Sequence, residues 1–345
     1  MSSKPSLRMP AEFAPHTATW LTWPHNLNSW PDAFEPIPAV WGEMVAALHK
    51  HEPVHILVND AEARARAAEL LERRGVSLGN VFFHLIPSND SWMRDHGPTF
   101  VIRSGDGAPR LAGVDWIYNA WGGKYPPWDR DAKIAGSICE VLGIERIEPG
   151  IVLEGGSIEV NGRGTLLTTE SCLLNPNRNP QLTRADFERI LGELLGVTNV
   201  LWLGDGIAGD DTDGHIDDLT RFVDPTTVVT IVCEDPVDCD YEPLQENYRR
   251  LQGMKDQDGQ PLRVVALPTP GPQLREGHRM PASYANFYIA NGVVLVPVFG
   301  DPNDQRALSV LAELLPGREI KGIYATDLVW GLGAFHCVTQ QQPQV

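Results

Sequence analysis

The sequence predicts a single α/β domain built from repeated units in the style of a propeller, and three observations lead to this prediction. Strand-like and helical patterns alternate along all 345 residues. No linker, charge block or low-complexity run divides the chain, so residues 1–345 are expected to form one domain. A polar turn that leads into a hairpin and then a helix also recurs at intervals of roughly 50 to 70 residues. These turns lie near Asp95, Glu154, Asp217, Asn286 and, for the turn and strand alone, Cys337.

In the first half of the chain, short apolar runs alternate with longer periodic ones. Strands are predicted over residues 13–24, 55–58, 81–86, 99–102 and 111–118, and helices over 38–51, 61–74 and 132–142. The second and third of these helices are each followed by a glycine, which commonly ends a helix. The fifth strand runs into residues 119–128, a loop rich in aromatic residues, glycine and proline. Loops of this rigid kind often cover a site, so Trp121 becomes a candidate substrate contact.

In the second half of the chain, Asn161 and Asn291 each precede a glycine and mark a hairpin turn. The predicted hairpins join strands 151–160 to 164–169 and 283–290 to 293–299. Helices are predicted over residues 183–195, 242–254 and 304–315, and further strands over 200–203, 215–223, 228–233 and 334–340. The first of these helices has a distinct start, because Thr183 and Asp186 have the spacing of a capping box.

The composition is that of a soluble globular enzyme or binding protein, with 42% hydrophobic residues and a formal net charge of −17. This charge argues against nucleic acid or an anionic membrane as a partner and suits a cationic ligand, although acidity often serves solubility alone. Residues 1–6 lack the apolar run of a secretory signal, and no stretch is apolar over the length of a membrane span. A cytoplasmic protein is therefore expected, and the sequence leaves open whether it forms a homo-oligomer.

The five cysteines are scattered along the chain and lack the paired spacing of a zinc site. They are expected to be reduced thiols, as in cytosolic proteins. Cys139, Cys172 and Cys233 lie in helical or apolar segments and are interpreted as buried packing residues. No metal site is predicted.

Residues 210–218 place His215 between two groups of carboxylates. If a strand begins at His215, side chains alternate between its two faces, so His215 and Asp217 share one face while Ile216 and Asp218 point to the other. A titratable base beside a carboxylate is typical of catalytic sites. The alternative is a solvated acidic turn with one surface histidine.

Two further carboxylates are candidates for the same site. Asp95 follows Trp92 in a turn, and an aromatic ring beside a carboxylate suits a planar cation. Alternatively, Asp95 pairs with Arg94 or caps the turn. Glu154 lies in a predicted apolar strand, where an unpaired charge is costly. A partner such as a histidine is therefore expected, unless this position faces solvent at a sheet edge.

Cys337 follows Gly331 and Gly333, and glycines before a cysteine leave space for a substrate and for backbone donors. Its neighbour His336 would face the opposite side of the predicted strand, so His215 is the better partner. A cysteine that shares a site with a histidine and carboxylates is a candidate nucleophile. Taken alone, Cys337 would more often be a packing residue.

Five segments of the sequence together resemble the agmatine deiminase family, also called the bacterial peptidyl-arginine-deiminase-like family. They are WMRDHGP, NAWGGKYPPWD, LEGGSIEVNGRGTLLTTESCLLNPNRNP, DDTDGHIDD and HCVTQQQP, and they occur in this order over essentially the whole chain. The resemblance implies the pentein fold, a five-bladed pseudosymmetric ββαβ propeller with its site on the central axis. That fold agrees with the repeat described above.

The resemblance also implies a role for each candidate residue. Cys337 matches the nucleophile, His215 the general acid and base, Asp95 and Asp217 the carboxylates that grip a guanidinium, and Glu154 the carboxylate that orients the histidine. Asp211 stands where many members carry a glutamate near the distal amine of the substrate, and Trp92 where an aromatic residue lines the pocket. Leu332 interrupts the glycine run before Gly333, and Asp211 is one methylene shorter than glutamate. Both differences concern the pocket for the substrate tail.

The implied reaction is hydrolysis of agmatine to N-carbamoylputrescine and ammonia, a step toward putrescine, through a covalent amidino-thioether on Cys337. The substrate is a small cationic guanidine, and the chemistry needs neither a metal nor an organic cofactor. Deimination of arginine, free or in a peptide, is the nearest competing activity, although an acidic pocket favours agmatine because agmatine lacks the α-carboxylate. Amidino transfer to an amine, a non-catalytic cation-binding pentein and a metallohydrolase built on His215 also stay open. The single histidine and the absence of HxH spacing argue against the metallohydrolase.

Overall fold

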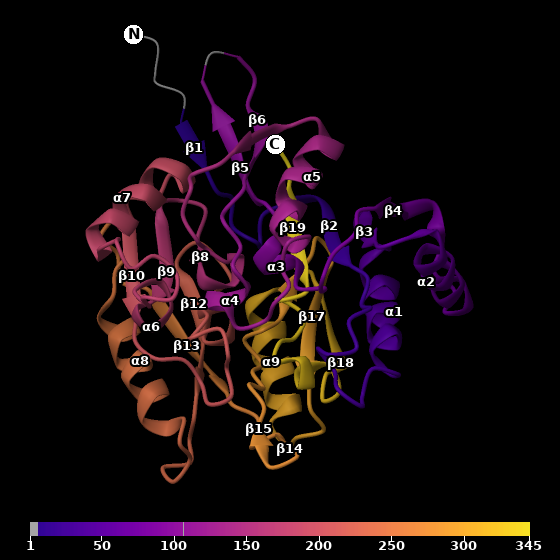
Figure 1. Cartoon of the computed structure of the whole chain (residues 1–345). Helices are drawn as coiled ribbons and strands as arrows, with labels where there is room; N and C mark the ends of the chain where they lie inside the picture. The colour runs from indigo at the N-terminus through magenta and orange to yellow at the C-terminus, as the bar shows by residue number, and fades with distance from the viewer. Residues whose placement is uncertain (1–5, 106) are drawn as a thin grey trace.

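The structure is a computed structural model and describes residues 6–105 and 107–345 (Figure 1). The expectation that residues 1–6 are not a secretory signal concerns a segment of which residues 1–5 lie outside the described residues. Within the described ranges, no helix has both the length and the apolarity needed to cross a bilayer.

Five sheets in the described residues repeat one topology, in which the first strand of a unit is antiparallel to the second and the second is parallel to the third. The first sheet has the order β19 (Thr339–Pro343), β2 (His16–Thr22), β3 (Val54–Val58), β4 (Val81–Leu85), and the second has the order β1 (Ser6–Arg8), β5 (Thr99–Ser104), β6 (Arg110–Val114), β7 (Glu145–Ile147). The other three are β8 (Glu159–Val160), β9 (Thr165–Thr169), β10 (Asn199–Leu203); β11 (Thr220–Phe222), β12 (Thr227–Val232), β13 (Arg263–Pro268); and β16 (Tyr288–Ile289), β17 (Val293–Val298), β18 (Glu319–Tyr324). A small hairpin, β14 (Leu274–Arg275) and β15 (His278–Arg279), completes the strands.

A helix connects the two parallel strands of each unit, as a parallel crossover requires. These helices are α1 (Ile37–Leu48), α5 (Ile134–Leu142), α7 (Arg184–Leu195), α8 (Tyr241–Gly253) and α9 (Asp304–Leu314), and α2 (Ala61–Arg73) makes the additional connection from β3 to β4. The strands and helices thus form five ββαβ units within one α/β fold. Of the short helical turns, α3 (Met93–His96) lies between β4 and β5, while α4 (Ala120–Gly123) and α6 (Glu170–Leu173) precede α5 and α7 within their crossovers.

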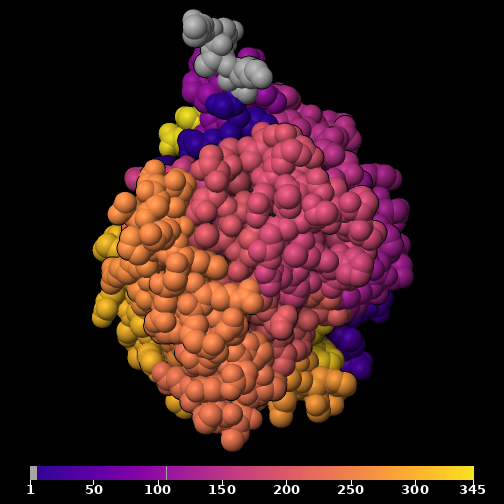
Figure 2. Space-filling model, turned by 90° about the vertical axis from the view of Figure 1, so that its left-hand side faces the viewer, coloured from indigo at the N-terminus to yellow at the C-terminus, as the bar shows by residue number. Residues whose placement is uncertain are grey.

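The first sheet is completed by strands that lie far apart in the sequence. β19 pairs antiparallel with β2, so the yellow and indigo ends of the chain meet in Figure 1. Neighbouring units also contact each other through buried charges, for example where Arg221 on β11 donates to Glu159 on β8 at 3.0 Å. Figure 2 shows these two units side by side, as the rose and orange parts of one continuous surface.

Most predicted elements are present within a few residues of their predicted ends. The capping box at α7 is formed by Thr183 and Asp186, and Gly196 ends that helix with left-handed backbone angles. Both predicted hairpins are present, as β8–β9 and β16–β17. The prediction missed the third strand of several units, including β13 and β18, which precede or follow loops with weak patterning.

Three predicted strands are wrong at the residues that matter for the site. Residues 216–218 form a 3-10 turn, and β11 begins at Thr220 instead of His215. Residues 155–157 form another such turn, so Glu154 precedes a turn and does not lie within a strand. β19 begins at Thr339, which leaves Cys337 outside it. In each unit the chain turns just before its first strand. The polar side chains on that turn point into the protein interior instead of alternating between the two faces of a strand.

Candidate active site

The turns before the first strands of the five units bring the candidate residues together. Asp95 precedes β5, Glu154 precedes β8, His215 and Asp217 precede β11, Asn286 precedes β16, and Cys337 precedes β19. The contacts below join these residues into one buried cluster, with exposures between 0 and 5%. A surface turn at His215 and an edge position at Glu154 were the alternatives, and the complete burial of both residues argues against them.

His215 lies between the two carboxylates that were expected to share its site. Its Nδ1 is 3.9 Å from Asp95 Oδ1 and 3.9 Å from Asp217 Oδ1. Burial by itself would lower the pKa of this imidazole, but Asp95, the Cys172 sulfur and Asp217 raise the pKa well above its ordinary value. The histidine is therefore suited to carrying a proton.

Asp95 is fixed by two donors and does not pair with its neighbour Arg94. Its Oδ1 accepts from the Gly156 N–H at 2.9 Å, and its Oδ2 accepts from Trp121 Nε1 at 3.0 Å. Burial raises the pKa of this carboxyl, with Asp217 and Glu154 adding to the rise against the opposing charge of His215. Trp121 therefore reaches the site through a hydrogen bond to Asp95 and through its ring.

Gly156 leaves the space in which His215, Asp95 and Asp217 approach one another. A Cβ at this position would lie 2.5 Å from His215 Nδ1 and 3.0 Å from both Asp217 Oδ2 and Asp95 Oδ1. Contacts that short require the site atoms to move. The glycine is thus needed for close approach, and any larger side chain would displace the cluster.

Cys337 is a buried thiol held by an amide and faced by carboxylates. Its Sγ lies 3.7 Å from Asp217 Oδ2 and 3.1 Å from Asn286 Nδ2. The orientation of the Asn286 amide follows from its oxygen, which accepts from the backbone N–H groups of His336 (3.0 Å) and Cys337 (3.3 Å). Burial raises the pKa of the thiol well above its ordinary value, and Asp217, Asp218 and Asp95 raise it further.

Asp218 is also part of the site, which contradicts the expectation that it points away from Asp217. In the 3-10 turn successive side chains are about a third of a turn apart, so both aspartates reach the same interior. Asp218 Oδ1 accepts from Asn286 Nδ2 at 2.9 Å, and its carboxylate lies within 4.8 Å of that of Asp217 and of the Cys337 sulfur. Burial raises its pKa well above the ordinary value, with Asp217 and Asp210 adding to the rise.

Glu154 lies near His215 and is anchored by an arginine that sequence reasoning did not single out. Its Oε1 accepts from Arg178 Nε at 2.9 Å, and Glu154, Cys172 and His215 have ligand atoms within 4.8 Å of one another. Arg178 also donates to the Thr212 carbonyl at 2.9 Å and pairs with Asp213. The arginine therefore links the predicted partner of the histidine to the loop that carries the histidine.

Aromatic rings and a glycine form one wall of the site. The Trp92 and Trp121 ring centroids are 6.4 Å apart with planes at 76°. A Cβ on Gly333 would lie 2.6 Å from the Trp92 ring and 3.2 Å from Cys337 Sγ. The glycine before the cysteine thus lets the indole pack next to the sulfur, as expected for residues that line a pocket.

Asp211 lies farther out and contacts the aromatic loop. It accepts a hydrogen bond from the Tyr125 hydroxyl, and its Oδ1 is 3.4 Å from Lys124 Nζ. Lys124 also donates to Asp213 Oδ1 at 2.9 Å. Residues 119–125 are therefore tied to the 211–213 segment, and Ala120 and Trp121 hold left-handed backbone angles there, which is unusual for residues other than glycine.

Four of the seven buried side-chain atoms without a hydrogen-bond partner among the described residues lie in this cluster. They are Glu154 Oε2, His215 Nδ1, His215 Nε2 and Asp217 Oδ1. Buried polar atoms are nearly always paired, and exceptions that gather at one place indicate a ligand site. The second oxygen of each of the two carboxylates is bonded to a buried basic side chain, so one acceptor on each stays available.

The same groups include potential metal ligands. Glu154, Cys172 and His215 form one set with atoms within 4.8 Å, and Asp217, Asp218 and Cys337 form another. In each set one carboxylate oxygen is already bonded to a basic side chain, Arg178 or His336. This leaves single acceptors at separate places, which fits the edge of a planar cation better than the shell of one ion.

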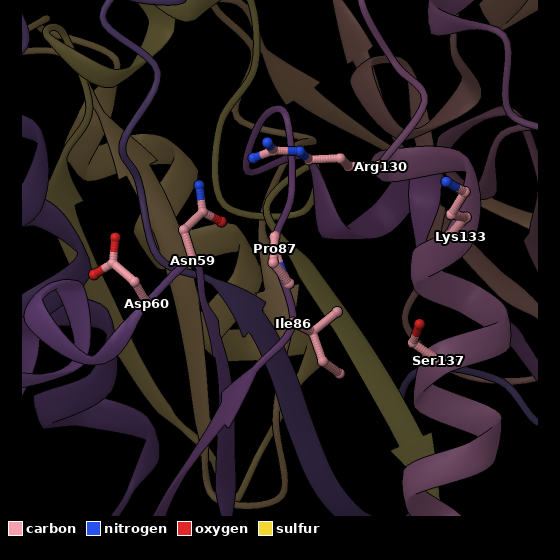
Figure 3. A pocket seen from close by; sticks show the side chains of 7 residues that line it. All are labelled: Asn59, Asp60, Ile86, Pro87, Arg130, Lys133 and Ser137. Atoms are coloured by element: carbon pink, nitrogen blue, oxygen red, sulfur yellow. The ribbon is translucent and has the colours of Figure 1, made fainter.

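A hollow lies apart from this cluster. It has a volume of about 520 Å³ and is lined by Asn59, Asp60, Ile86, Pro87, Arg130, Lys133 and Ser137 (Figure 3). Its cations, Arg130 and Lys133, are exposed, and its lining contains none of the unpaired buried atoms. The chemistry of the chain is therefore concentrated at the Cys337 cluster.

Comparisons with known proteins agree with the motifs. A sequence model of the Porphyromonas-type peptidyl-arginine deiminase family matches residues 8–343. An agmatine deiminase of Stutzerimonas stutzeri is 40% identical, covering 97% of this chain and 95% of that protein. The structure is similar to that of the Enterococcus faecalis agmatine deiminase, with a TM-score of 0.91, 36% identity, and coverage of 98% and 96% of the two chains. The structure is also similar to that of a cysteine-to-serine variant of the C. jejuni agmatine deiminase with substrate bound. The TM-score is 0.89 and the identity 30%, and the match covers 100% of this chain and 98% of that chain.

A more distant likeness concerns the fold alone. An amidinotransferase from Microseira wollei shares 12% identity with a TM-score of 0.51. The fold therefore has both deiminase and amidinotransferase neighbours, as expected of a pentein. The close matches extend over nearly the full length of this chain, and the chain belongs to the agmatine deiminase family, the Porphyromonas-type peptidyl-arginine deiminases.

Proposed function

We propose that this protein hydrolyses agmatine to N-carbamoylputrescine and ammonia, with Cys337 as the nucleophile. The observation that carries the proposal is the gathering of unpaired buried polar atoms around a thiol: the acceptors Asp217 Oδ1 and Glu154 Oε2, and the ring nitrogens of His215. A guanidinium offers several N–H donors in one plane and a positive charge, which suit the unpaired oxygens of Asp217 and Glu154. The named activity of the relatives supports the same assignment.

We assign the grip on the guanidinium to Asp95 and Asp217, which flank His215 from different units. Charge-assisted hydrogen bonds from the planar cation to two carboxylates would fix its orientation and present its carbon to Cys337. The indole rings of Trp92 and Trp121 would cover its face. This arrangement makes the bond between Trp121 and Asp95 part of the binding surface.

The chemistry then needs one nucleophile and one proton carrier. The Cys337 thiolate attacks the guanidinium carbon, and His215 gives a proton to the departing nitrogen as the C–N bond breaks and ammonia leaves. An amidino-thioether remains on the sulfur. Water adds to its carbon while His215 accepts a proton, and breaking of the C–S bond releases the ureido product and restores the thiolate. Glu154 acts in this scheme by holding His215 in place.

Substrate binding would also prepare the nucleophile. Within the cluster, burial and the charges of Asp217, Asp218 and Asp95 hold the pKa of Cys337 well above its usual range. A bound guanidinium places a positive charge among the same carboxylates and opposes their effect on the thiol. The thiolate would therefore form mainly in the presence of the cation on which it acts.

The substrate tail would lie toward Asp211 and the aromatic loop. Lys124 is the basic group near Asp211, and it is already paired with Asp213 and Asp211. The region is therefore acidic in balance, which favours the terminal amine of agmatine over the α-carboxylate of free arginine. Agmatine deimination would place the protein on a route toward putrescine, and we place it in the cytoplasm, whose reducing conditions keep thiols free.

We also infer that the five ββαβ units surround a common axis as the blades of a propeller. The supporting observations are that each unit contributes its site residue from the same position, just before its first strand, and that β19 returns to pair with β2. The site would then lie on that axis.

The test is ammonia release from agmatine, free arginine and a blocked arginyl peptide, measured side by side. Turnover of agmatine with kcat/KM at least about 100-fold above that for either arginine substrate is the expected result, since a pocket built for one polar tail rejects another strongly. Preference for the peptide would instead identify a peptidyl-arginine deiminase. Tight agmatine binding without ammonia release would identify a cation-binding protein without this activity.

A further inference from the structure

His336 is buried next to Asp217 and bridges two carboxylates. Its Nδ1 is 2.6 Å from Asp217 Oδ2, and its Nε2 is 2.8 Å from Glu12 Oε2. All three side chains are nearly completely buried. An ionised carboxylate can only accept a hydrogen bond, so bonds to both carboxylates require a proton on each ring nitrogen. His336 bridging two carboxylates is then an imidazolium.

Glu12 is held in turn by donors from four segments of the chain. Its Oε1 accepts from Arg221 Nη2 and the Ile289 N–H, both at 2.8 Å. Its Oε2 accepts from Arg94 Nη2 at 3.1 Å in addition to His336. Burial by itself would raise the pKa of Glu12, but Arg221, His336 and Arg94 lower it well below the ordinary value. Glu12 is therefore a fixed anion on which His336 rests.

The bridge determines which oxygen of Asp217 remains available. Oδ2 is occupied by His336, while Oδ1 has no partner among the described residues and lies on the side of His215. Asp217 also differs from Asp95 and Asp218 in the direction in which its surroundings shift its pKa. Burial would raise its pKa, but the bond and charge of His336, with His215 and Arg221, lower its pKa, whereas the pKa values of Asp95 and Asp218 are raised. Of the three carboxylates, Asp217 is thus the one whose ionised form is favoured, through its contact with His336.

We propose that His336, fixed by Glu12, is a positioning residue that holds the Asp217 carboxylate with Oδ1 directed toward the substrate guanidinium. The inference rests on the proposed function, because it gives Asp217 its role in binding the cation. It assigns no contact between His336 and the substrate, and the effect of His336 must therefore pass through Asp217. The effects of substitutions at His336 and Asp217 on agmatine binding should therefore not be additive.

The test measures agmatine binding by calorimetry in the Cys337→Ser protein, so that no turnover occurs. His336→Gln keeps a neutral donor but removes the charge, and we expect it to weaken binding by roughly 10- to 100-fold. In a protein that also carries Asp217→Asn, His336→Gln should add less than about threefold, because the group on which it acts has lost its charge. In a protein that carries Asp95→Asn, which His336 does not contact, it should keep its full effect.

Equal effects of His336→Gln in both backgrounds would overturn the proposal, even if binding were weaker throughout. If Asp217→Asn and Asp95→Asn both left agmatine binding unchanged, the proposed function would fail together with this inference. His16→Gln is the matched control, since His16 is a second buried histidine bonded to a carboxylate, Glu52 at 3.2 Å, and contacts Glu12 only at its backbone carbonyl. It should lower the Tm without changing the Kd.

A measurement on the unmodified protein tests the proposal if His336→Gln does not fold. In 15N-histidine-labelled protein, both ring nitrogens of His336 should carry a proton, as hydrogen bonds to two carboxylates require. A neutral His336 with one unprotonated nitrogen would contradict the bridge. The same spectrum recorded with Asp217→Asn should show a changed Nδ1–H resonance for His336 and an unchanged one for His16.

Discussion

Replacing Asp217 with asparagine removes one charge at the centre of the site while keeping the shape of the side chain. Asp217 Oδ2 accepts from His336 and faces the Cys337 thiol, and Oδ1 is the unpaired acceptor proposed for the substrate. An amide has one acceptor and one donor group, so a donor must face either His336 or the guanidinium. In a buried site, truncating one partner of such a charge pair costs about 2–5 kcal/mol.

This cost corresponds to a loss in agmatine affinity of about 30- to 5,000-fold. The value of kcat should fall as well, because the carbon would no longer be held in line with the sulfur. The assays are kcat and KM from ammonia release and the Kd of the Cys337→Ser form. Asp256→Asn is the control, since this buried aspartate caps a turn by accepting from the backbone N–H groups of Asp258 and Gln260, a role that asparagine also fills. Wild-type kinetics for Asp217→Asn would refute the guanidinium grip.

Four further outcomes are expected. Cys337→Ser should abolish turnover by several orders of magnitude yet leave the Tm and agmatine binding nearly unchanged, and activity above a few per cent of wild type would exclude Cys337 as the nucleophile. Gly156→Ala should lower kcat by about 100-fold or more with a smaller effect on the Tm, because its Cβ would lie 2.5 Å from His215 Nδ1; unchanged kcat would show that the cluster tolerates displacement. Activity should survive EDTA and be lost with iodoacetamide, with substrate protecting the thiol; loss on chelation that divalent metal restores would favour the metallohydrolase instead. Alkylation of the empty enzyme should be slow near neutral pH and still rising above pH 9.0, the ordinary value for a thiol, because the raised pKa of Cys337 keeps it protonated; a plateau at a pH below that ordinary value would contradict the raised pKa.

The parts of the fold that depend on local signals could be predicted from the sequence. The capping box at Thr183 and the Asn-Gly turns act within a few residues, and they fixed the start of α7 and two hairpins. The recurring polar turns in the sequence indicated Asp95, Glu154, Asp217 and Cys337 as candidates, and these residues lie at the same place in their units, just before the first strand. Their roles remain the proposals given above.

The parts that depend on distant contacts could not be predicted in this way. The strand assumed from His215 onward gave Asp218 the wrong direction, since only the surrounding units make a 3-10 turn the better solution. Asp218 would therefore be a poor control for Asp217. Glu12 gave no local signal, and the contacts of His336 and Asn286 could not be predicted, because their partners lie up to several hundred positions away in the sequence. A buried glutamate beside an N-terminal strand looks like any acidic loop residue until the arginines that surround it are placed.

The pairing of β2 with β19 has a consequence for how the protein becomes active during synthesis. Trp20 on β2 donates to Gln342 on β19 across 322 positions of sequence. While the ribosome makes the intervening chain, β2 has an open edge, which is exposed to incorrect association. When β19 arrives it closes this edge, and the same short segment delivers Cys337 to its place beside Asp217. A nascent chain would thus gain its final sheet contact and its reactive sulfur in one event, and no shorter intermediate would be able to deiminate a guanidine.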